Sequence, residues 1–372
     1  MLRIRAHYHL AATPEGIEAR AAALALEQSI EMPLEAVSDA YVRDDVVARV
    51  EEIGELEPGR FRVVLGISTA TTGTEIGQLM NMLFGNCSLQ NDVELADVEL
   101  PETMLDAFEG PRHGLDGLRA LVGAGDRALT MTALKPQGLG AADLATLAGT
   151  FARAGLDIIK DDHGIADQAR APFAERVVAC QRAVAEANAA TGGRSLYAPA
   201  LSGGPKELAR QLRIAREEGV HAVLACPMLM GLPTFVELVR DAMSCAIVVH
   251  PALGGAARIH PPLLFGKLFR LLGADATVFP NYGGRFSYSR ATCLALARAA
   301  RAPWGRLRAC APVPAGGMSV ARVPEMLDAY GKDVILLVGG ALLMAGRELG
   351  ARSREFVDCV RRARVPDGAV AS

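Results

Sequence analysis

Four consecutive side chains that can do chemistry follow a short apolar run near the middle of the chain. Lys160, Asp161, Asp162 and His163 come directly after the run Leu156–Ile159. A lysine, two carboxylates and an imidazole are costly to bury unless they are paired or bound to a metal ion. Oxygen ligands suit Mg²⁺, which one or two carboxylates usually hold together with substrate oxygens. The pattern therefore predicts either a magnesium site or a solvated loop that begins the next helix.

A lysine and a histidine end two other apolar runs. Lys135 follows the run Ala128–Leu134 and precedes a proline, which stops a strand. A lysine desolvated by its neighbours can act as a general base, and the alternative is an ordinary surface lysine whose stem lies along apolar neighbours. His250 ends the run Cys245–His250 and is either a contact to substrate oxygens or a buried, satisfied histidine. The remaining histidines lie away from such ends and carry no functional prediction: His7, His9, His113, His221 and His260.

Small and polar residues follow the last three apolar runs. Asn281 and Arg285 come after the first of them. Two glycine-rich ends follow the others, and exposed backbone N–H groups at such places commonly bind phosphate, although glycine pairs also make plain tight turns. These ends contain Ala315, Gly316, Gly317, Gly339 and Gly340.

Eight short apolar runs alternate with helix-like segments after residue 110. Uninterrupted apolar strands, each followed by a helix, indicate a parallel sheet buried on both faces. We therefore expect a (β/α)₈ barrel over residues 111–372, with its chemistry at the carboxyl ends of the strands. An open doubly wound sheet is the alternative, but the glycine motifs of its nucleotide-binding versions are missing. The predicted strands are Ala128–Leu134, Leu156–Lys160, Ser195–Leu201, His221–Cys226, Cys245–His250, Ala276–Asn281, Leu307–Val313 and Val334–Gly340.

The first 110 residues mix strand-like and helix-like patterns, which indicates a smaller α+β domain of the ferredoxin-like kind. Residues 109–114 contain a Gly-Pro pair and mark a linker. The predicted strands are Arg3–Leu10, Arg60–Ile67 and Asp92–Leu100, and the predicted helices are Pro14–Ser29 and Glu75–Phe84.

Composition excludes several classes of protein. The chain has 372 residues with 51% hydrophobic side chains and a net charge of −3, so we expect no nucleic-acid partner. Its longest nearly apolar run, Val334–Gly346, is too short to span a membrane. The seven cysteines are scattered and form no CxxC pair, as in a reduced cytoplasmic protein.

The order of these motifs resembles that of the large subunit of ribulose-bisphosphate carboxylase (RuBisCO), and more closely that of the RuBisCO-like proteins. The resemblance covers nearly the whole chain. In the barrel it rests on Lys135-Pro136, Gly155–Asp162, Pro312–Met326 and Tyr330–Gly340. In the N-terminal domain it rests on Leu26–Pro33 and Phe84–Gln90.

The resemblance implies a role for each matching residue. Lys160 corresponds to the lysine that CO₂ carbamylates and that binds Mg²⁺ together with Asp162. Lys135 corresponds to the lysine near the carbon that loses a proton, and His250 to a histidine near the substrate. The four glycines of the two glycine-rich ends correspond to phosphate-binding positions. Glu27 and Asn86 match residues that reach the partner subunit's active site, which implies a homodimer with shared sites.

Several departures from the family pattern argue against true carboxylation. His163 stands where a second acidic metal ligand is expected, so that a weaker Mg²⁺ site or a softer metal is implied. The loop after the sixth strand, residues 281–289, has no lysine to stabilise a carboxylated intermediate. Other family residues are replaced by Gln137, Pro251 and Ala315, and Pro33 lies near the position of a phosphate-binding threonine.

The retained lysines and carboxylate support enolisation, so we expect a metal-dependent 1,3-proton transfer on a phosphorylated ketose. The family's reactions of this kind include those on 5-methylthioribulose 1-phosphate in methionine salvage. Two alternatives stay open. One is a decarboxylase or transcarboxylase of a branched keto-acid sugar phosphate, and the other is a non-catalytic binding or regulatory homologue.

Overall fold

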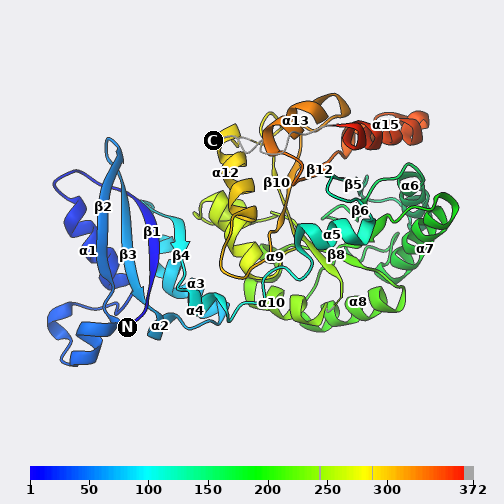
Figure 1. Cartoon of the computed structure of the whole chain (residues 1–372). Coiled ribbons are helices and arrows are strands. Elements are labelled where there is room, and N and C mark those ends of the chain that lie inside the picture. Colours follow the sequence, from blue (N-terminus) through cyan, green and yellow to red (C-terminus); the bar gives the residue numbers. More distant parts are fainter. Residues whose placement is uncertain (243, 287, 364–372) are drawn as a thin grey trace. The chain divides into compact units, whose positions relative to one another are not determined.

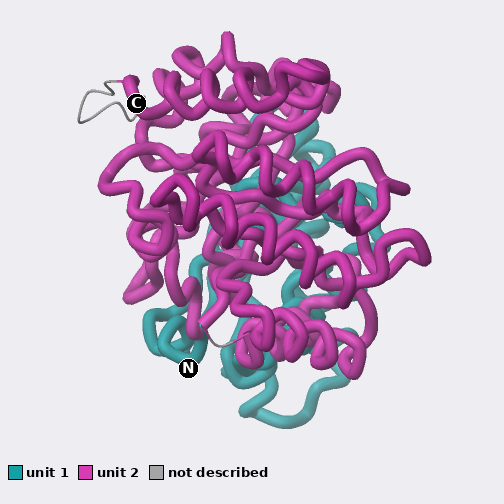
Figure 2. Tube along the Cα trace, turned by 90° about the vertical axis from the view of Figure 1, so that its right-hand side faces the viewer, with its two compact units in different colours: residues 1–108, 253–264 teal, residues 109–252, 265–372 magenta. Residues whose placement is uncertain are grey.

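The structure is a computed structural model that describes residues 1–242, 244–286 and 288–363. The chain divides into two compact units (Figure 2). The first unit contains Met1–Phe108 and also Leu253–Leu264, a segment from much later in the chain. The second unit contains Glu109–Ala252 and the chain from Phe265 onward. Each unit is described by itself below.

The N-terminal unit is built on an antiparallel four-stranded sheet in the order β2-β3-β1-β4, which is the predicted ferredoxin-like arrangement. The sheet is apolar on one face only. Alternate residues of β1, such as Ile4 and Tyr8, are fully buried, and the Tyr8 hydroxyl donates to the Leu83 carbonyl of α3 at 2.6 Å. The opposite face carries polar side chains that include His7 and His9. The strands are β1 (Arg3–Ala11), β2 (Arg49–Glu57), β3 (Arg60–Ser68) and β4 (Val93–Glu99).

Two main helices accompany this sheet, α1 (Ile17–Glu27) and α3 (Ile76–Phe84). The shorter helical turns of the unit are η1 (Leu34–Ala36), η2 (Val42–Val46), α2 (Thr69–Thr72), η3 (Asn86–Leu89), α4 (Glu102–Leu105) and η4 (Gly254–Ala256). The edge strand β2 is absent from the sequence prediction. Nearly all of its residues are exposed, so that its sequence carries no alternation of apolar and polar positions.

The second unit is the predicted barrel (Figure 1). Eight parallel strands form two four-stranded sheets, ordered β12-β5-β6-β7 and β8-β9-β10-β11. Backbone hydrogen bonds from Leu224 to Pro199 and from Leu201 to Leu224 join β7 to β8, and β11 lies against β12. The ring is therefore closed, which rules out the open sheet. The strands are β5 (Leu129–Leu134), β6 (Ile158–Asp161), β7 (Leu196–Ala198), β8 (Ala222–Ala225), β9 (Ala246–Val249), β10 (Ala276–Pro280), β11 (Ala311–Ala315) and β12 (Ile335–Leu337).

Helices surround the barrel and close one end of it. Leu115, Leu118 and Val122 of α5 pack against inward side chains, several of which begin their strands, as Leu129 and Ala222 do. This closes the amino-terminal end, so that polar groups are left to the carboxyl end. The helices are α5 (Gly114–Val122), α6 (Ala141–Arg153), α7 (Phe173–Thr191), α8 (Pro205–Glu217), α9 (Pro227–Met230), α10 (Leu232–Asp241), α11 (Phe269–Leu271), α12 (Arg290–Arg301), α13 (Val323–Tyr330), α14 (Gly340–Leu343) and α15 (Leu349–Arg362), with the turns η5 (Pro262–Leu268), η6 (Val320–Arg322) and η7 (Gly346–Glu348).

The cysteines are all free thiols, and every one except Cys359 is buried. Among the described residues, no helix is both long enough and apolar enough to cross a membrane.

Candidate active site

Lys135 and Asp162 meet at the carboxyl ends of two neighbouring strands. The parallel register places Leu134 of β5 beside Asp161 of β6, so the next residue of each strand leaves the barrel at the same point. Lys135 Nζ lies 2.8 Å from Asp162 Oδ1. The Asp162 side chain is 9% exposed and that of Lys135 is 35% exposed, so the lysine reaches the carboxylate from the solvent side.

Three neighbouring side chains keep Asp162 ionised. Burial alone would raise the pKa of this carboxyl group. Hydrogen bonds from His163 and Lys135, with the charges of Lys135 and Lys160, outweigh burial and hold the pKa of Asp162 well below its ordinary value. A buried anion with several nearby donors is a suitable ligand for a hard cation.

Lys160 lies inside the barrel and is almost inaccessible, with 2% of its surface exposed. Its Nζ donates to the Asp161 carbonyl oxygen at 3.0 Å. Burial, assisted by the charge of Lys135 and opposed by that of Asp162, lowers the pKa of Lys160 to about 8. A larger fraction of this amine is therefore neutral than in an exposed lysine, and the neutral amine is the nucleophile.

Asp161 has a structural role, although it lies between two candidate site residues. Because side chains alternate along a strand, Asp161 points away from Lys160 and Asp162 and toward α7. Its carboxylate accepts from Arg176 Nε at 3.0 Å, from the Tyr197 hydroxyl at 2.9 Å and from the Ala200 N–H at 3.0 Å. Both members of the Asp161–Arg176 pair are fully buried. The pair links β6 to α7 on the side of the strand that faces away from the site.

His163 and His250 stack on each other beside these groups. Their ring centroids lie 3.9 Å apart with an interplanar angle of 9°. His163 Nδ1 lies 3.5 Å from Asp162 Oδ1. Burial, followed by the charge of Lys160, lowers the pKa of His250 to about 2, so its ring is neutral at physiological pH. Because His250 Nδ1 accepts from the Ala252 N–H at 3.2 Å, Nε2 carries the hydrogen and can donate it to a substrate.

The loops after β10 and β11 pack backbone against backbone. A Cβ on Gly317 would lie 2.5 Å from the Gly284 Cα, and Gly316 and Gly317 both have positive φ angles. Only glycine fits such an approach. Arg322 fixes the loops by donating to the Gly317 carbonyl at 2.9 Å and the Tyr282 carbonyl at 3.4 Å. The sequence prediction contains the glycines but not this arginine.

The other predicted glycine-rich end is open. Gly339 follows β12 and precedes the first residue of α14, Gly340, and a Cβ at either glycine would meet nothing within 4 Å. Ala315 is the last residue of β11 and is half-buried. Arg285 is exposed in the loop after β10, with its guanidinium carbon 5.1 Å from the centre of the Phe286 ring. These positions have room for a ligand.

Asn281 was predicted to face the site, but its side chain points elsewhere. Its side chain is 1% exposed and turned into the core. There its Oδ1 accepts from the Tyr330 hydroxyl at 2.6 Å, and its Nδ2 contacts the sulfur atoms of Met318 and Met326 at 3.3 and 3.1 Å. The strand end was identified correctly, but a polar residue at a strand end can point inward when the core supplies its partners.

Glu27 and Asn86 lie in the N-terminal unit, where they belong to neighbouring elements. Glu27 is the last residue of α1 and is half-buried, and Asn86 is the exposed first residue of η3. Their predicted role in a partner subunit's site stays a prediction.

Cys226 is a site neighbour that the sequence reasoning missed. It follows β8 at the carboxyl end of the barrel. Burial raises the pKa of this thiol to about 11, and the charges that act on it are those of Lys160 and Asp162. The thiol is therefore protonated at physiological pH. Cys226 ends a predicted strand, which could have identified it as a site neighbour. The sequence analysis treated it only as one of the scattered reduced cysteines.

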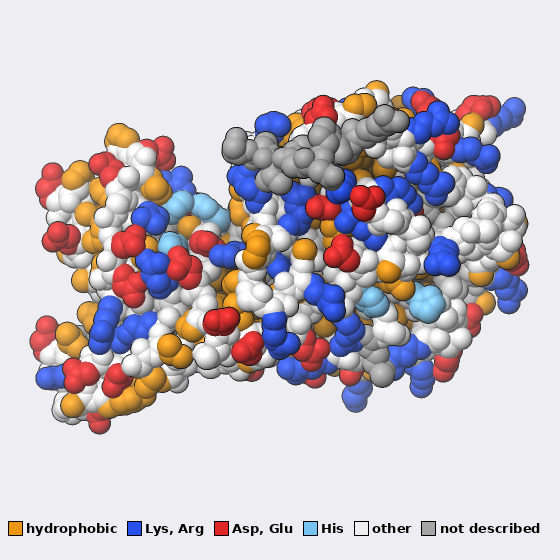
Figure 3. All heavy atoms as spheres, viewed as in Figure 1, with side chains coloured by type: hydrophobic (Ala, Val, Ile, Leu, Met, Phe, Trp, Pro, Cys, Tyr) orange, Lys and Arg blue, Asp and Glu red, His pale blue; other side chains and the backbone are white. Residues whose placement is uncertain are grey.

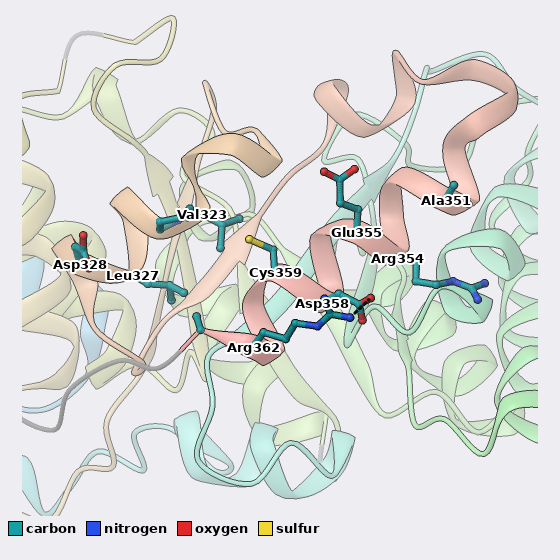
Figure 4. Close-up of a pocket in the computed structure, with 12 residues that line it drawn as sticks. Val323, Leu327, Asp328, Ala351, Arg354, Glu355, Asp358, Cys359 and Arg362 are labelled. Carbon is teal, nitrogen blue, oxygen red and sulfur yellow. Dashed lines mark hydrogen bonds and ion pairs between the residues drawn. The ribbon is translucent and has the colours of Figure 1, made fainter.

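A surface groove between α13 and α15 is separate from this site. Val323, Leu327 and Asp328 line one side and Glu355, Asp358 and Cys359 the other (Figure 4). None of the candidate catalytic residues lines it.

Comparisons with known proteins agree with the fold. Residues 114–286 match the family described as ribulose bisphosphate carboxylase large chain, catalytic domain. The chain is 55% identical to the 5-methylthioribulose-1-phosphate isomerase of Rhodospirillum rubrum over 96% of each chain. It is 33% identical to the 2,3-diketo-5-methylthiopentyl-1-phosphate enolase of Geobacillus thermodenitrificans, over 80% of this chain and 76% of that protein. The crystal structure of a RuBisCO-like protein from Rhodopseudomonas palustris superposes with a TM-score of 0.92 at 54% identity, covering 98% of this chain and 99% of that one.

Proposed function

The chain belongs to the RuBisCO large-chain family, among its RuBisCO-like members, and from that premise we propose that it is a metal-dependent isomerase of a ketose phosphate. The reaction is a 1,3-proton transfer that leaves the carbon skeleton intact. The observation that carries the proposal is the contact of 2.8 Å between Lys135 Nζ and Asp162 Oδ1 beside the buried amine of Lys160. A mobile base, a carboxylate and a reactive amine thus meet at the ends of two neighbouring strands.

The donor set fits a magnesium ion. Asp162 is ionised and buried, and the neutral amine of Lys160 can add to CO₂, forming a carbamate and releasing one proton. The carbamate, Asp162 and the imidazole of His163 would hold Mg²⁺. When bound there, the ion would polarise the substrate's carbonyl group and so acidify the neighbouring C–H bond.

Proton transfer is assigned to Lys135. After the ammonium of Lys135 has released a proton to solvent, the neutral amine removes a proton from the carbon next to the carbonyl and returns it to the other carbon of the enediol. Lys135 leaves its ion pair with Asp162 for this purpose, which the exposure of its side chain permits. His250 donates from Nε2 to a substrate oxygen and, being neutral, places no second charge beside Lys160.

The glycine-rich ends bind the phosphate in this proposal. Backbone N–H groups of Gly316 and Gly317 on one loop, and of Gly339 and Gly340 on the other, approach it without side chains in the way. Ala315 directly precedes Gly316, and Arg285 directly follows Gly284, whose Cα lies against Gly317. In a homodimer, Glu27 and Asn86 of each chain would complete the partner's site.

The proposed substrate is 5-methylthioribulose 1-phosphate. Its support is the 55% identity with an isomerase of that name over nearly the full length of both chains. An enolase acting on 2,3-diketo-5-methylthiopentyl 1-phosphate is the second candidate, supported by a relative at 33% identity. Both reactions use the same base and the same carboxylate, so the substrate has to be settled by assay.

The test is ¹H NMR in D₂O with the purified protein, Mg²⁺ and bicarbonate. We expect deuterium to enter 5-methylthioribulose 1-phosphate and a new isomer to accumulate. Turnover of the diketo phosphate alone would replace the first candidate by the second. Absence of exchange with either compound, in protein that binds Mg²⁺, would reject the proposal. CO₂ release from a branched keto-acid phosphate would then identify a decarboxylase.

A further inference from the structure

The polar face of the N-terminal sheet gathers two histidines and a glutamate that the proposed reaction does not use. His9 lies on β1 directly opposite Glu94 on β4, and His260 comes from the segment Leu253–Leu264 of the same unit. Their potential ligand atoms all lie within 4.8 Å of one another. Histidine side chains reach the surface of this unit among acidic and basic groups (Figure 3).

The backbone fixes all three positions. His9 and Glu94 are a cross-strand pair of the antiparallel sheet, whose Cβ atoms lie on one face. The later segment runs parallel to β4, with the Leu95 N–H donating to the Arg258 carbonyl at 3.0 Å and the His260 N–H to the Leu95 carbonyl at 2.9 Å. Arg258 adds a hydrogen bond to the Gln90 carbonyl at 2.6 Å. β4, which carries Glu94, is therefore paired with β1 on one side and with the segment of His260 on the other.

We propose that His9, Glu94 and His260 bind one divalent transition-metal ion of the zinc type. His260 Nε2 lies 3.2 Å from Glu94 Oε2, and two ligands of a tetrahedral zinc ion at 2.0–2.1 Å are separated by roughly 3.3 Å. The rings of His9 and His260 are nearly perpendicular, at 84°, with centroids 4.5 Å apart, so two imidazoles have room around one ion. The fourth position is open to water, because all three side chains are partly exposed.

The protonation states suit a metal ligand set. Burial, then the charges of His260 and Arg60, lowers the pKa of His9 to about 4, so this imidazole is neutral at physiological pH. Although burial opposes it, the hydrogen bond from His260 and the charge of Arg60 lower the pKa of Glu94, which is ionised. Two imidazoles and one carboxylate favour zinc over the magnesium proposed for the barrel.

Arg60 is the competitor for this site. Its guanidinium donates to Glu94 Oε2 at 2.5 Å and lies 3.3 Å from His9 Nδ1. The side chain is 39% exposed, and Glu57 Oε1 already lies 3.6 Å from its other nitrogen. Arg60 can therefore turn toward Glu57 and leave Glu94 to the metal ion.

The ion would tie together parts of the chain that are far apart in sequence. Glu94 and His260 are separated by 166 positions, so a metal bridge between them closes a long loop. Binding free energy at such a bridge adds to the stability of the folded unit. The bridge would hold the segment Leu253–Leu264 against β4 within the N-terminal unit.

The test is calorimetric titration of chelator-treated, full-length protein with Zn²⁺. Every sample carries Asp162→Asn, which removes the binding site proposed in the barrel. We expect one equivalent of Zn²⁺ to bind and His260→Ala to weaken it by at least about 100-fold. His7→Ala is the matched control, because His7 lies two positions earlier on the same face of β1 and pairs with Glu99 at 2.9 Å. It should change the dissociation constant by less than about twofold.

A variant that binds Zn²⁺ more tightly tests the proposal independently, because a folding defect would weaken binding. Arg60→Ala removes the competing cation, and we expect it to tighten Zn²⁺ binding by about tenfold. With Co²⁺ as a probe, the visible absorption of a tetrahedral ion should appear in the His7→Ala protein and disappear in His260→Ala. Equal Zn²⁺ affinity with and without His260, or no gain from Arg60→Ala, would overturn the proposal.

Discussion

Lys135 Nζ lies 2.8 Å from Asp162 Oδ1, so the proposed base contacts an oxygen atom of the proposed metal ligand. A cation that binds Asp162 competes with the lysine ammonium for this oxygen. In the proposed mechanism, metal binding and release of the base would therefore be coupled at this contact. The two side chains differ in accessibility, 35% against 9%, so the lysine is the partner that can move.

Replacing Lys135 should separate catalysis from metal binding. We expect Lys135→Met to reduce deuterium exchange and turnover by at least about 100-fold, because the base is lost. Mg²⁺ affinity, measured by calorimetry with bicarbonate present, should rise, because the competing ammonium is gone. Lys332→Met is the control, since Lys332 pairs with Asp126 at 3.0 Å outside the site. A fall in Mg²⁺ affinity in Lys135→Met would contradict the coupling.

The two adjacent aspartates should respond differently to the same substitution. Asp161→Asn leaves Arg176 buried without its charge partner, which is expected to cost about 3–5 kcal/mol of unfolding free energy. Asp162→Asn removes a partner from the half-exposed Lys135, so its cost should stay near ~1 kcal/mol while Mg²⁺ binding is lost. Denaturant unfolding and calorimetry measure the two effects. Similar stability losses in both variants would show that Asp162 is also structural.

The barrel could be predicted because its strands are buried on both faces. Runs such as Leu129–Leu134 are buried throughout, and their order along the chain equals their order around the ring. The exposed edge strand β2 gave no comparable signal. The segment Leu253–Leu264 was also missed as part of the N-terminal unit, because it pairs with β4 across more than half of the barrel sequence.

The sequence predicted which strand ends form the candidate site, but it did not predict which way each side chain points. Lys160 and Asp162 face the site, whereas Asp161 between them pairs with α7. Asn281 turns inward because Tyr330 and two methionine sulfur atoms supply its partners. His9 and His260 carried no prediction, since 251 positions of sequence separate them and only the folded sheet brings them together.

The amino-terminal cap of α3 should make stability depend on pH. Glu75 accepts from the Gly77 and Gln78 N–H groups at 2.8 and 2.7 Å, and these bonds lower its pKa in the folded state. Its contribution is therefore complete above the unfolded value near 4.5 and is lost as pH falls through the lower folded value. Glu75→Ala should cost about 1 kcal/mol at neutral pH and less at about pH 3.5.

The control for this cap is Glu186→Ala on the exposed side of α7. Its effect on unfolding by guanidinium should be the same at both pH values. A Glu75→Ala effect that does not shrink on acidification would mean that the carboxylate is not acting as the cap.

Position 163 should set the strength of the metal site. His163 Nδ1 lies 3.5 Å from Asp162 Oδ1, where the family pattern has a second carboxylate. We expect His163→Glu to tighten Mg²⁺ binding by about tenfold, because it adds a negative charge and a hard oxygen ligand. His163→Gln, a neutral side chain of similar size, should not tighten it, although both variants remove the stack on His250. Equal Mg²⁺ affinity in the native protein and both variants, measured with bicarbonate, would place residue 163 outside the metal site.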